Sequence, residues 1–213
     1  MTRLLLIRHG QSLANLQGRF AGHSDFPLTE LGLRQAEATA RYIAETYQVD
    51  AVYSSDLQRA YHTGLATANK LGLPITTDTQ LREIFAGAWE GVLFSDLDLR
   101  YPEDIDGFRH NIGLSRCTEG ESVAEMILRI RSAIDRIAEA HNGQTVAIAC
   151  HGTPIRSLLW MAAGTPIEHM QEIPWPTNAS VSEFAWEDGR LTLVSASTDA
   201  HLADLVSEFS LTK

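Results

Sequence analysis

The chain has 213 residues, enough for one large domain, or one domain with an insertion, that buries its own core. Its composition, 44% hydrophobic and 21% charged, excludes disorder, collagen and a coiled coil for the whole chain. No apolar run approaches about 18 residues, so no membrane span is expected. Lys and Arg number 17 against 27 Asp and Glu, and this net charge of −10 argues against general nucleic-acid binding.

The two cysteines, Cys117 and Cys150, are too few for a disulfide framework and lack the spacing of a redox or zinc motif. Cys150 ends an apolar run and is interpreted as a small buried residue. At the N-terminus the apolar run Leu4–Ile7 is too short for a signal peptide. We therefore expect a cytoplasmic protein.

Three short apolar runs predict strands buried on both faces, as in a parallel sheet. They are Leu4–Ile7, Ala51–Tyr53 and Val146–Cys150. Each run is followed by polar residues and then by a helical pattern. This alternation predicts an α/β sandwich with a mostly parallel central sheet.

Two helices are predicted from apolar residues at helical spacing. The first has Thr29 as its N-cap, and the second begins with the capping-box spacing of Ser122 and Glu125 and ends before Asn142-Gly143. The stripes are Ala36, Ala40, Ile43 and Tyr47, and Val123, Met126, Ile127, Ile130, Ile134 and Ile137. We assign both stripes to core packing rather than to a binding face.

Near the C-terminus, Asp188-Gly189 separates the apolar-rich runs Val181–Trp186 and Leu191–Val194, which predicts a tight hairpin and an antiparallel edge. The stretch from about Val92 to Glu119 has no clean helical or strand period. We interpret it as an inserted cap over a site, within a single domain of residues 1–213. A homodimer through an edge strand is also a hypothesis, with the first and last strands as candidates.

Basic side chains follow the predicted strands at the edge where open α/β sheets bind ligands. The first strand continues into Arg8-His9-Gly10, the second leads through Ser54-Ser55-Asp56 to Arg59, and the third leads into His151-Gly152. Two histidines and two arginines should therefore converge.

Arginine forks match phosphate oxygens, and imidazole can act as a nucleophile or proton carrier near neutral pH. The glycines after the histidines would let a phosphate approach the backbone, and helix N-termini favour anions. The sequence therefore predicts a pocket for a small-molecule phosphomonoester.

Each of these residues also has a structural interpretation. A lone histidine at a strand end is more often structural, and a lone arginine on a helix more often lies on the surface. The joint placement at neighbouring strand ends favours a site instead. The eight histidines show no HxxxH or HExxH pair, so we expect neither a metal nor another cofactor.

These residues resemble the histidine phosphatase superfamily, the clan that includes phosphoglycerate mutase. The segments that carry the resemblance are Leu6–Ser12, Asn15, Gly18–Gly22, Pro27–Gly32, Gln35-Ala36, Ser54–Ala60, Thr63, Leu81–Glu83, Gly87, Trp89–Gly91, Gly120–Ser122 and His151-Gly152. Asn178–Val181 matches only weakly. The resemblance implies a three-layer, phosphoglycerate mutase-like fold with an inserted cap.

The resemblance also implies roles. His9 would be the nucleophile that forms a phosphohistidine, and Glu83 would be the general acid and then the base. Arg8, Arg59 and His151 would hold the phosphoryl oxygens. The substrate side would include Gly10, Gln11, Asn15, Ala21, Gly22 and Gly152. The ring of His9 must be neutral, and its second nitrogen needs an acceptor that fixes the tautomer.

Glu90 is a competing carboxylate for the acid role, but the family pattern assigns that role to Glu83. The cap aromatics could form an apolar wall for a substrate, or they could be the cap's own small core, which we favour. That set consists of Phe85, Phe94, Tyr101 and Phe108, together with Ile112.

The resemblance leaves two activities open. A mutase of this family carries extra basic residues in the insertion, whereas this segment has Arg100, Arg109 and Arg116 against five acidic residues: Asp96, Asp98, Glu103, Asp104 and Asp106. The acid segment Glu83–Gly91 also lacks the Arg and Tyr that follow the glutamate in the mutase branch. We therefore favour a phosphatase, and the alternative is a cofactor-dependent phosphoglycerate mutase-type phosphoryl transferase. A non-catalytic binder and a phosphohistidine carrier are further hypotheses.

Overall fold

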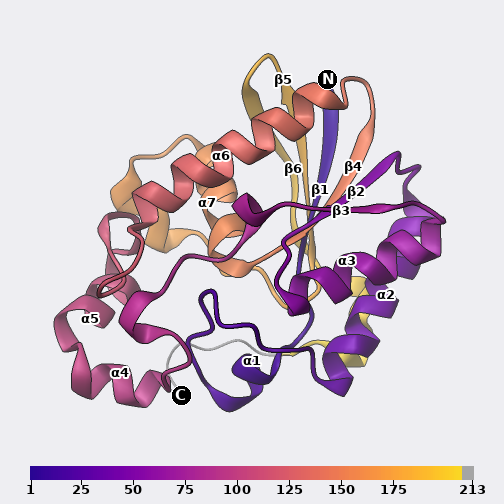
Figure 1. Cartoon of the computed structure of the whole chain (residues 1–213). Helices are drawn as coiled ribbons and strands as arrows, with labels where there is room; N and C mark the ends of the chain where they lie inside the picture. Colours follow the sequence, from indigo (N-terminus) through magenta and orange to yellow (C-terminus); the bar gives the residue numbers. More distant parts are fainter. Residues whose placement is uncertain (208–213) are drawn as a thin grey trace.

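The computed structural model of the chain describes residues 1–207, in which six strands form one sheet with helices on both faces (Figure 1). The strands are β1 (Thr2–Arg8), β2 (Ala51–Ser54), β3 (Ile75–Thr77), β4 (Thr145–Cys150), β5 (Val181–Glu187) and β6 (Arg190–Thr198). Their order is β3-β2-β4-β1-β5-β6, with β1 to β4 parallel and β5 and β6 antiparallel. The predicted α/β fold is confirmed.

The long helices form two layers. Helices α2 (Glu30–Thr46) and α3 (Gln58–Leu71) cover one face of the sheet, and α6 (Val123–Ala140) and α7 (Gly152–Ala163) cover the other. The shorter elements are α1 (Leu13–Gln17), α4 (Phe94–Arg100) and α5 (Pro102–His110), with the 3-10 helices η1 (Thr79–Leu81), η2 (Gly87–Trp89), η3 (Ile112–Leu114), η4 (Ile167–Glu172) and η5 (Ala200–Leu205).

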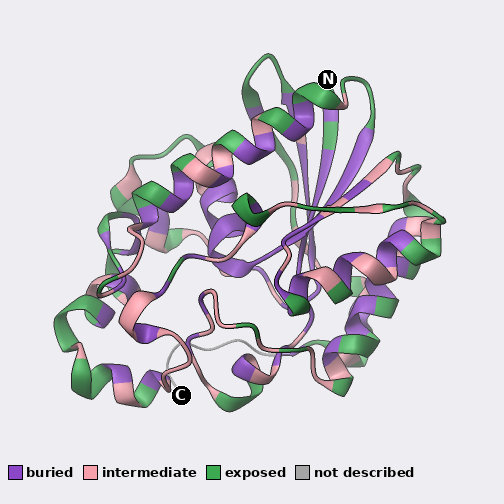
Figure 2. Cartoon of the chain, viewed as in Figure 1, coloured by how far each residue is buried: buried purple, intermediate pink, exposed green. Residues whose placement is uncertain are grey.

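Strand β1 is apolar from Leu4 to Ile7 because both of its faces are covered there (Figure 2). Successive side chains of a strand point to opposite faces. Leu4 and Leu6 therefore pack with α6 and α7, while Leu5 and Ile7 pack with α2 and α3. This double burial holds β1 in a fixed register between β4 and β5, which places the residue after Arg8 at a defined point.

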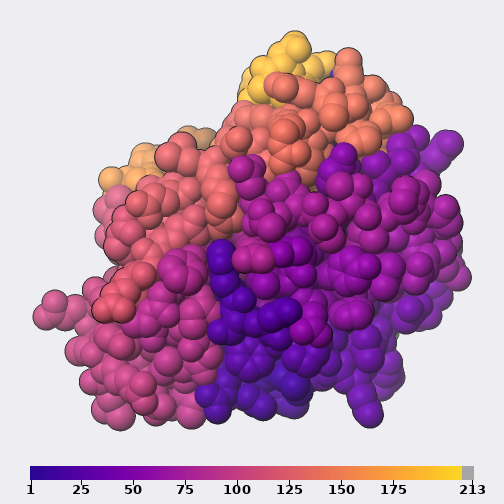
Figure 3. Space-filling view, viewed as in Figure 1, coloured from indigo at the N-terminus to yellow at the C-terminus, as the bar shows by residue number. Residues whose placement is uncertain are grey.

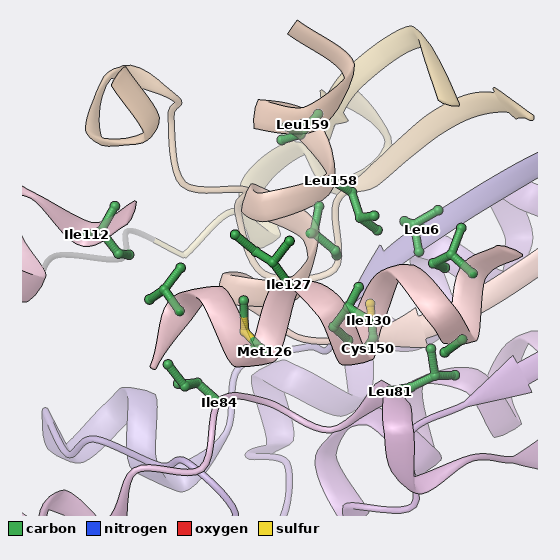
Figure 4. Close-up of a cluster of buried hydrophobic side chains, with 14 of the residues drawn as sticks. Leu6, Leu81, Ile84, Ile112, Met126, Ile127, Ile130, Cys150, Leu158 and Leu159 are labelled. Carbon is green, nitrogen blue, oxygen red and sulfur yellow. The ribbon is translucent and has the colours of Figure 1, made fainter. Parts of the chain in front are cut away.

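The largest hydrophobic cluster of the described residues lies under α6 (Figure 4). Met126, Ile127 and Ile130 of α6 face Leu158 of α7 and Cys150 at the end of β4. Cys150 is buried and its thiol is free, as the sequence predicted. This cluster extends from the sheet to Ile84 and Ile112, so it also fixes the segment around Glu83 and the cap.

The predicted helix starts and the predicted hairpin are confirmed. The Thr29 hydroxyl accepts a hydrogen bond from the Gly32 amide at 3.0 Å. Ser122 and Glu125 form a capping box at the start of α6. Asp188 and Gly189 have φ values of 49° and 75°, and this left-handed pair makes the two-residue turn between β5 and β6.

The segment from 92 to 119, in which the sequence shows no clean helical or strand period, contains the helices α4 and α5 and the 3-10 helix η3. Helices of seven and nine residues, separated at Tyr101 by the proline that opens α5, are too short to show a helical period. That this segment is an insertion in a single domain stays a prediction.

The position of β1 corrects one part of the dimer hypothesis. β1 lies between β4 and β5, so the first strand has no free edge. The edges of the sheet within residues 1–207 are β3 and β6, and a dimer through β6 stays a prediction. None of the helices in the described part of the chain is both long and apolar enough to cross a membrane.

Candidate active site

The site lies where β1, β4 and β2 end side by side. Arg8 is in register with Cys150, and Ala149 with Ser54, so the residues that follow these strands emerge together. The rings of His9 and His151 consequently lie 5.3 Å apart, centroid to centroid. The convergence expected from strand polarity is therefore present in the structure.

A pocket of about 460 Å³, including its open mouth, lies over this edge. Its lining is Arg8, His9, Asn15, Arg19, Phe20, Ala21, Gly22, Arg59, Glu83, Phe94, Phe108, Gly152, Thr153 and Trp175. On the face shown in Figure 3, the early part of the chain (indigo) lies at the surface between the α4–α5 segment and the helices α2 and α3. The pocket lining joins residues far apart in the sequence, from Arg8 to Trp175, and includes Phe94 and Phe108 of the cap segment.

The geometry of His9 leaves one ring nitrogen available. Its Nδ1 lies 2.7 Å from the Gly10 carbonyl oxygen, which can only accept, so the neutral ring carries its proton on Nδ1 and its lone pair on Nε2. Burial, followed by the charges of Arg59 and Arg8, lowers the pKa of His9 well below its usual value. The buried ring is therefore uncharged and has a free nucleophilic nitrogen.

The two arginines are held by backbone carbonyls. Arg59 donates to Ser24 O at 2.9 Å and to Gly22 O at 2.7 Å, and Arg8 donates to Pro176 O. Burial lowers the pKa of each guanidinium to about 10, so both remain cationic at neutral pH. Two fixed cations beside His9 make a site that favours an anion with several oxygens, such as a phosphoryl group.

His151 lies behind the pocket lining and is fully buried. Its Nε2 is 2.9 Å from the hydroxyl of Ser55, and its Nδ1 has no hydrogen-bond partner among the described residues. Burial and the nearby charge of Arg59 lower its pKa well below the usual range, so the ring is neutral. An unpartnered nitrogen beside His9 is a group that a bound ligand could satisfy.

The two carboxylates differ in what they contact. Glu83 lines the pocket, and its two oxygens accept hydrogen bonds from the Ile84 amide at 2.9 Å and the Thr153 amide at 3.3 Å. Glu90 lies outside the lining and accepts bonds from the amides of His23, Ser24 and Ala86 and from the Ser24 hydroxyl. Glu90 therefore fastens a loop, while Glu83 faces the space where a ligand would bind.

Gly10 and Gln11 lie outside the pocket lining, contrary to our expectation for the substrate side. A Cβ on Gly10 would overlap the Gly32 carbonyl, so close backbone packing, rather than access for a phosphate, explains this glycine. The side-chain oxygen of Gln11 accepts a bond from Thr29 at 2.9 Å. Asn15, Ala21, Gly22 and Gly152 do line the pocket.

The structure adds lining residues that the sequence did not single out. Arg19 lies within Gly18–Gly22 and Thr153 directly follows His151-Gly152, but the sequence indicated no role for either. Trp175 was missed because it lies in irregular chain before β5. Phe94 and Phe108 line the pocket and are also buried in the core, so these cap aromatics serve both as a pocket wall and as core residues.

Within residues 1–207, no three His, Cys, Asp or Glu side chains gather as metal ligands would.

A family model described as histidine phosphatase superfamily (branch 1) matches residues 4–199. Because the match covers most of the chain, the protein belongs to the histidine phosphatase superfamily. The resemblance inferred from the motifs is thereby confirmed, and the strand-end site coincides with the segments that carried it.

Relatives by sequence carry different names. The chain is 37% identical over 190 residues to a bifunctional protein of Mycobacterium tuberculosis; this covers 88% of the chain but spans only about half (51%) of that relative's length. It is 29% identical to phosphoserine phosphatase 1 of Hydrogenobacter thermophilus, over 98% of both chains. It is also 31% identical to phosphoglycerate mutase-like protein 4 of Arabidopsis thaliana, covering 87% of this chain and 80% of that one.

Two solved structures confirm the fold. Bacillus stearothermophilus YhfR superposes with a TM-score of 0.90 at 29% identity, covering 95% of this chain and all of that one. A mycobacterial glucosyl-3-phosphoglycerate phosphatase complexed with VO3 superposes with a TM-score of 0.85 at 28% identity, covering 92% and 99%. The fold is therefore shared with a phosphatase of known structure.

Proposed function

We propose that the protein is a metal-independent phosphomonoester hydrolase that works through a phosphohistidine on His9. One observation carries this proposal: a neutral imidazole with a free Nε2 lies in one pocket with two buried arginines and a carboxyl group. Those are the groups that phosphoryl transfer to nitrogen needs, namely a nucleophile, charge stabilisation and a proton donor.

In the first half-reaction, Nε2 of His9 forms a bond to phosphorus as the bond from phosphorus to the ester oxygen breaks. The departing oxygen takes a proton from the Glu83 carboxyl group. Arg8 and Arg59 stabilise the negative charge on the remaining phosphoryl oxygens throughout. Because Nδ1 keeps its proton against the Gly10 carbonyl, the ring carries a positive charge while phosphorus is bonded to Nε2, and this charge favours departure of Nε2 in the next step.

In the second half-reaction, a water oxygen attacks phosphorus and the bond from phosphorus to Nε2 breaks. Glu83, now ionised, takes the proton from that water and regains its starting state. The products are inorganic phosphate and the free imidazole. One carboxyl group serves both steps because it recovers in the second the proton that it gave in the first.

The pairing of the cap arginines supports hydrolysis over mutase activity. Arg109 pairs with Asp98, Arg100 with Asp96 at 3.8 Å, and Arg116 with Glu125 at 2.7 Å. None of these three arginines belongs to the pocket lining. They therefore do not offer the pocket the extra positive charge that would hold the second acidic group of a mutase substrate or cofactor.

The test is phosphate release from a panel of phosphomonoesters in the presence of EDTA. The panel includes phosphoserine and glucosyl-3-phosphoglycerate, because two phosphatases that the chain resembles are named for these compounds. We expect release by the wild type, loss of release in His9→Ala, and full release in His110→Ala, a matched change at an exposed histidine of α5. Release that survives in His9→Ala, or that EDTA abolishes, would contradict the proposal.

A second assay separates the two activities. 3-Phosphoglycerate is supplied with 2,3-bisphosphoglycerate, and both 2-phosphoglycerate and free phosphate are measured. The proposal predicts free phosphate from the ester panel and little isomerisation. Fast isomerisation without phosphate release would favour the mutase alternative, because the phosphoenzyme would then be protected from water.

A further inference from the structure

The backbone that carries Glu83 is held from α6 by a single guanidinium group. Arg129 donates to the carbonyl oxygens of Gln80 at 2.6 Å, Arg82 at 3.0 Å and Glu83 at 3.1 Å. These carbonyls belong to the loop that runs from η1 into the pocket wall. These three bonds hold the loop where it passes the pocket, together with Nε2 of His23, which lies 2.8 Å from the Glu83 carbonyl oxygen.

Glu121 completes the attachment on the other side of Glu83. Its carboxylate accepts from Arg129 at 3.0 and 2.9 Å and from the Phe85 amide at 3.1 Å. The Glu121 amide in turn donates to the Phe85 carbonyl at 2.8 Å. The pair of Arg129 and Glu121 thus binds the backbone both before and after the general acid.

Arg129 and Glu121 form an ion pair that is mostly buried. The side chain of Arg129 is 20% exposed and that of Glu121 is 14% exposed, so both charges are largely removed from water. A buried ion pair is by itself weak evidence for stability, because desolvation offsets much of the attraction. Here the guanidinium of Arg129 also donates to the backbone of residues 80–83. These bonds indicate that the pair orients the segment that carries Glu83.

The Glu83 carboxylate has little else to orient it. Of its two hydrogen bonds, one comes from the adjacent amide of Ile84, and the other, from Thr153, is 3.3 Å long. Its position over the pocket therefore depends on the path of its own backbone. A misplacement of about 1 Å can reduce a reaction rate by about 100-fold.

We infer that Arg129, with Glu121, is a positioning residue for the proton transfer by Glu83. This rests on the proposed function, in which Glu83 protonates the leaving oxygen. The guanidinium never touches the substrate; it holds residues 80–83 so that the carboxyl group meets the ester oxygen. Its loss should therefore impair proton donation specifically, while phosphoryl binding by Arg8 and Arg59 continues.

The choice of ester gives a measurement that a general structural defect would not mimic. An alkyl alcohol leaves as a strongly basic oxygen and needs the proton, whereas 4-nitrophenolate leaves without it. The ratio of kcat/KM for the two esters reports on the acid, and kcat/KM covers steps up to the first irreversible one. A partly unfolded variant loses both activities in the same proportion, and the ratio stays constant.

The experiment compares Arg129→Met with Arg131→Met on an alkyl phosphate and on 4-nitrophenyl phosphate. Arg131 lies on the same helix, but its partners are Asp135 and the Gly189 carbonyl, away from the acid segment. For Arg129→Met we expect kcat/KM to fall at least about tenfold on the alkyl ester and less than about threefold on the aryl ester. For Arg131→Met both values should stay near the wild type.

Glu83→Gln separates this inference from the function on which it rests. If Glu83→Gln shows no selective loss on the alkyl ester, the proposed acid is wrong. If Glu83→Gln does show that selective loss, Arg129→Met must show it too. The positioning role is overturned if Arg129→Met loses activity on the two esters equally, or loses it on neither. Adding Arg129→Met to Glu83→Gln should cause no further selective loss.

Arg129→Lys keeps the inference testable if Arg129→Met does not fold. Lysine cannot reach all three carbonyls, so Arg129→Lys should show the same selective loss on the alkyl ester in weaker form. The absence of that selective loss would overturn the inference.

Discussion

Burial and two neighbouring guanidinium groups act on His9 in the same direction, since both disfavour a charged ring. The Gly10 carbonyl then decides which nitrogen keeps the proton. A nucleophile placed between two cations must be neutral to attack, and the tautomer must leave the attacking nitrogen bare. Burial and the charges of Arg59 and Arg8 meet the first requirement. The carbonyl of the next residue, Gly10, meets the second.

This arrangement predicts the ionisation of His9 in solution. The ring should remain uncharged, with its proton on Nδ1, at a pH near the usual histidine pKa of about 6.5, where an exposed histidine is half protonated. Nitrogen-15 NMR of the histidine rings, assigned with His9→Gln, measures both the charge and the tautomer. A protonated His9 ring at about pH 6.5, or a neutral ring with its proton on Nε2, would contradict the account.

A second prediction concerns Ser55, whose oxygen accepts the Leu57 amide at 3.3 Å and lies 2.9 Å from Nε2 of His151. No other acceptor for the Ser55 hydroxyl hydrogen is found among residues 1–207, so we expect the hydroxyl to donate to Nε2 and the proton of the neutral ring to lie on Nδ1. We expect Ser55→Ala to lower kcat/KM about tenfold and to change the tautomer of His151 in the NMR spectrum. An unchanged tautomer would show that Ser55 does not set it.

At the scale of elements, the chain after β1 is packed directly on the start of α2. A Cβ on Gly32 would overlap the Gln11 carbonyl, and one on Gly10 would overlap the Gly32 carbonyl. Both obstacles are backbone, which cannot swing aside as a side chain can. The first helical layer is therefore fitted to the segment that carries His9.

Gly32→Ala should consequently lower the free energy of unfolding by about 1–3 kcal/mol, because the added methyl overpacks this contact. The matched control is Gly107→Ala in α5, where a Cβ meets nothing within 4 Å. That change should raise the free energy of unfolding by up to about 1 kcal/mol, since alanine favours a helix. Urea denaturation of both variants measures the difference, and equal effects would refute the packing argument.

Elements with a local signature could be predicted from the sequence. The continuous apolar run of β1 and the capping box of α6 are such signatures, and the strand ends then located His9 and His151. The helices of the cap could not be predicted because each is too short to repeat. Trp175 reaches the pocket only through tertiary folding of irregular chain, which leaves no local pattern.

At the scale of the molecule, the buried neutral histidines make stability depend on pH. The pKa values of His9 and His151 are lowered by folding, so near and below the usual value of 6.5 the unfolded chain binds protons that the folded chain does not. Stability therefore falls as pH falls through 6.5 and is level above it, with each histidine adding up to about 1.4 kcal/mol per pH unit. The lowered pKa values of Asp56 and Glu125 act in a lower pH range.

Urea denaturation at about pH 7.5, 6.5 and 5.5 checks this linkage. We expect similar free energies of unfolding at the two higher values and a clear loss at the lowest. His9→Gln, which cannot take up a proton, should show a shallower decline over the same interval. A free energy of unfolding that rises towards the lowest pH would mean that these histidines are charged in the folded protein.

The central claim is that His9 itself carries the phosphoryl group, and trapping the phosphoenzyme tests it most directly. The protein is mixed with a phosphomonoester that it hydrolyses and is quenched in alkali within milliseconds. Phosphorus NMR and peptide mass mapping then locate the phosphoryl group. The account predicts an acid-labile, alkali-stable phosphate on Nε2 of His9, absent from His9→Ala and decaying in water to free phosphate. A phosphate found on another residue, or turnover without any phosphoenzyme in Glu83→Gln, where its hydrolysis should be slowed, would contradict it.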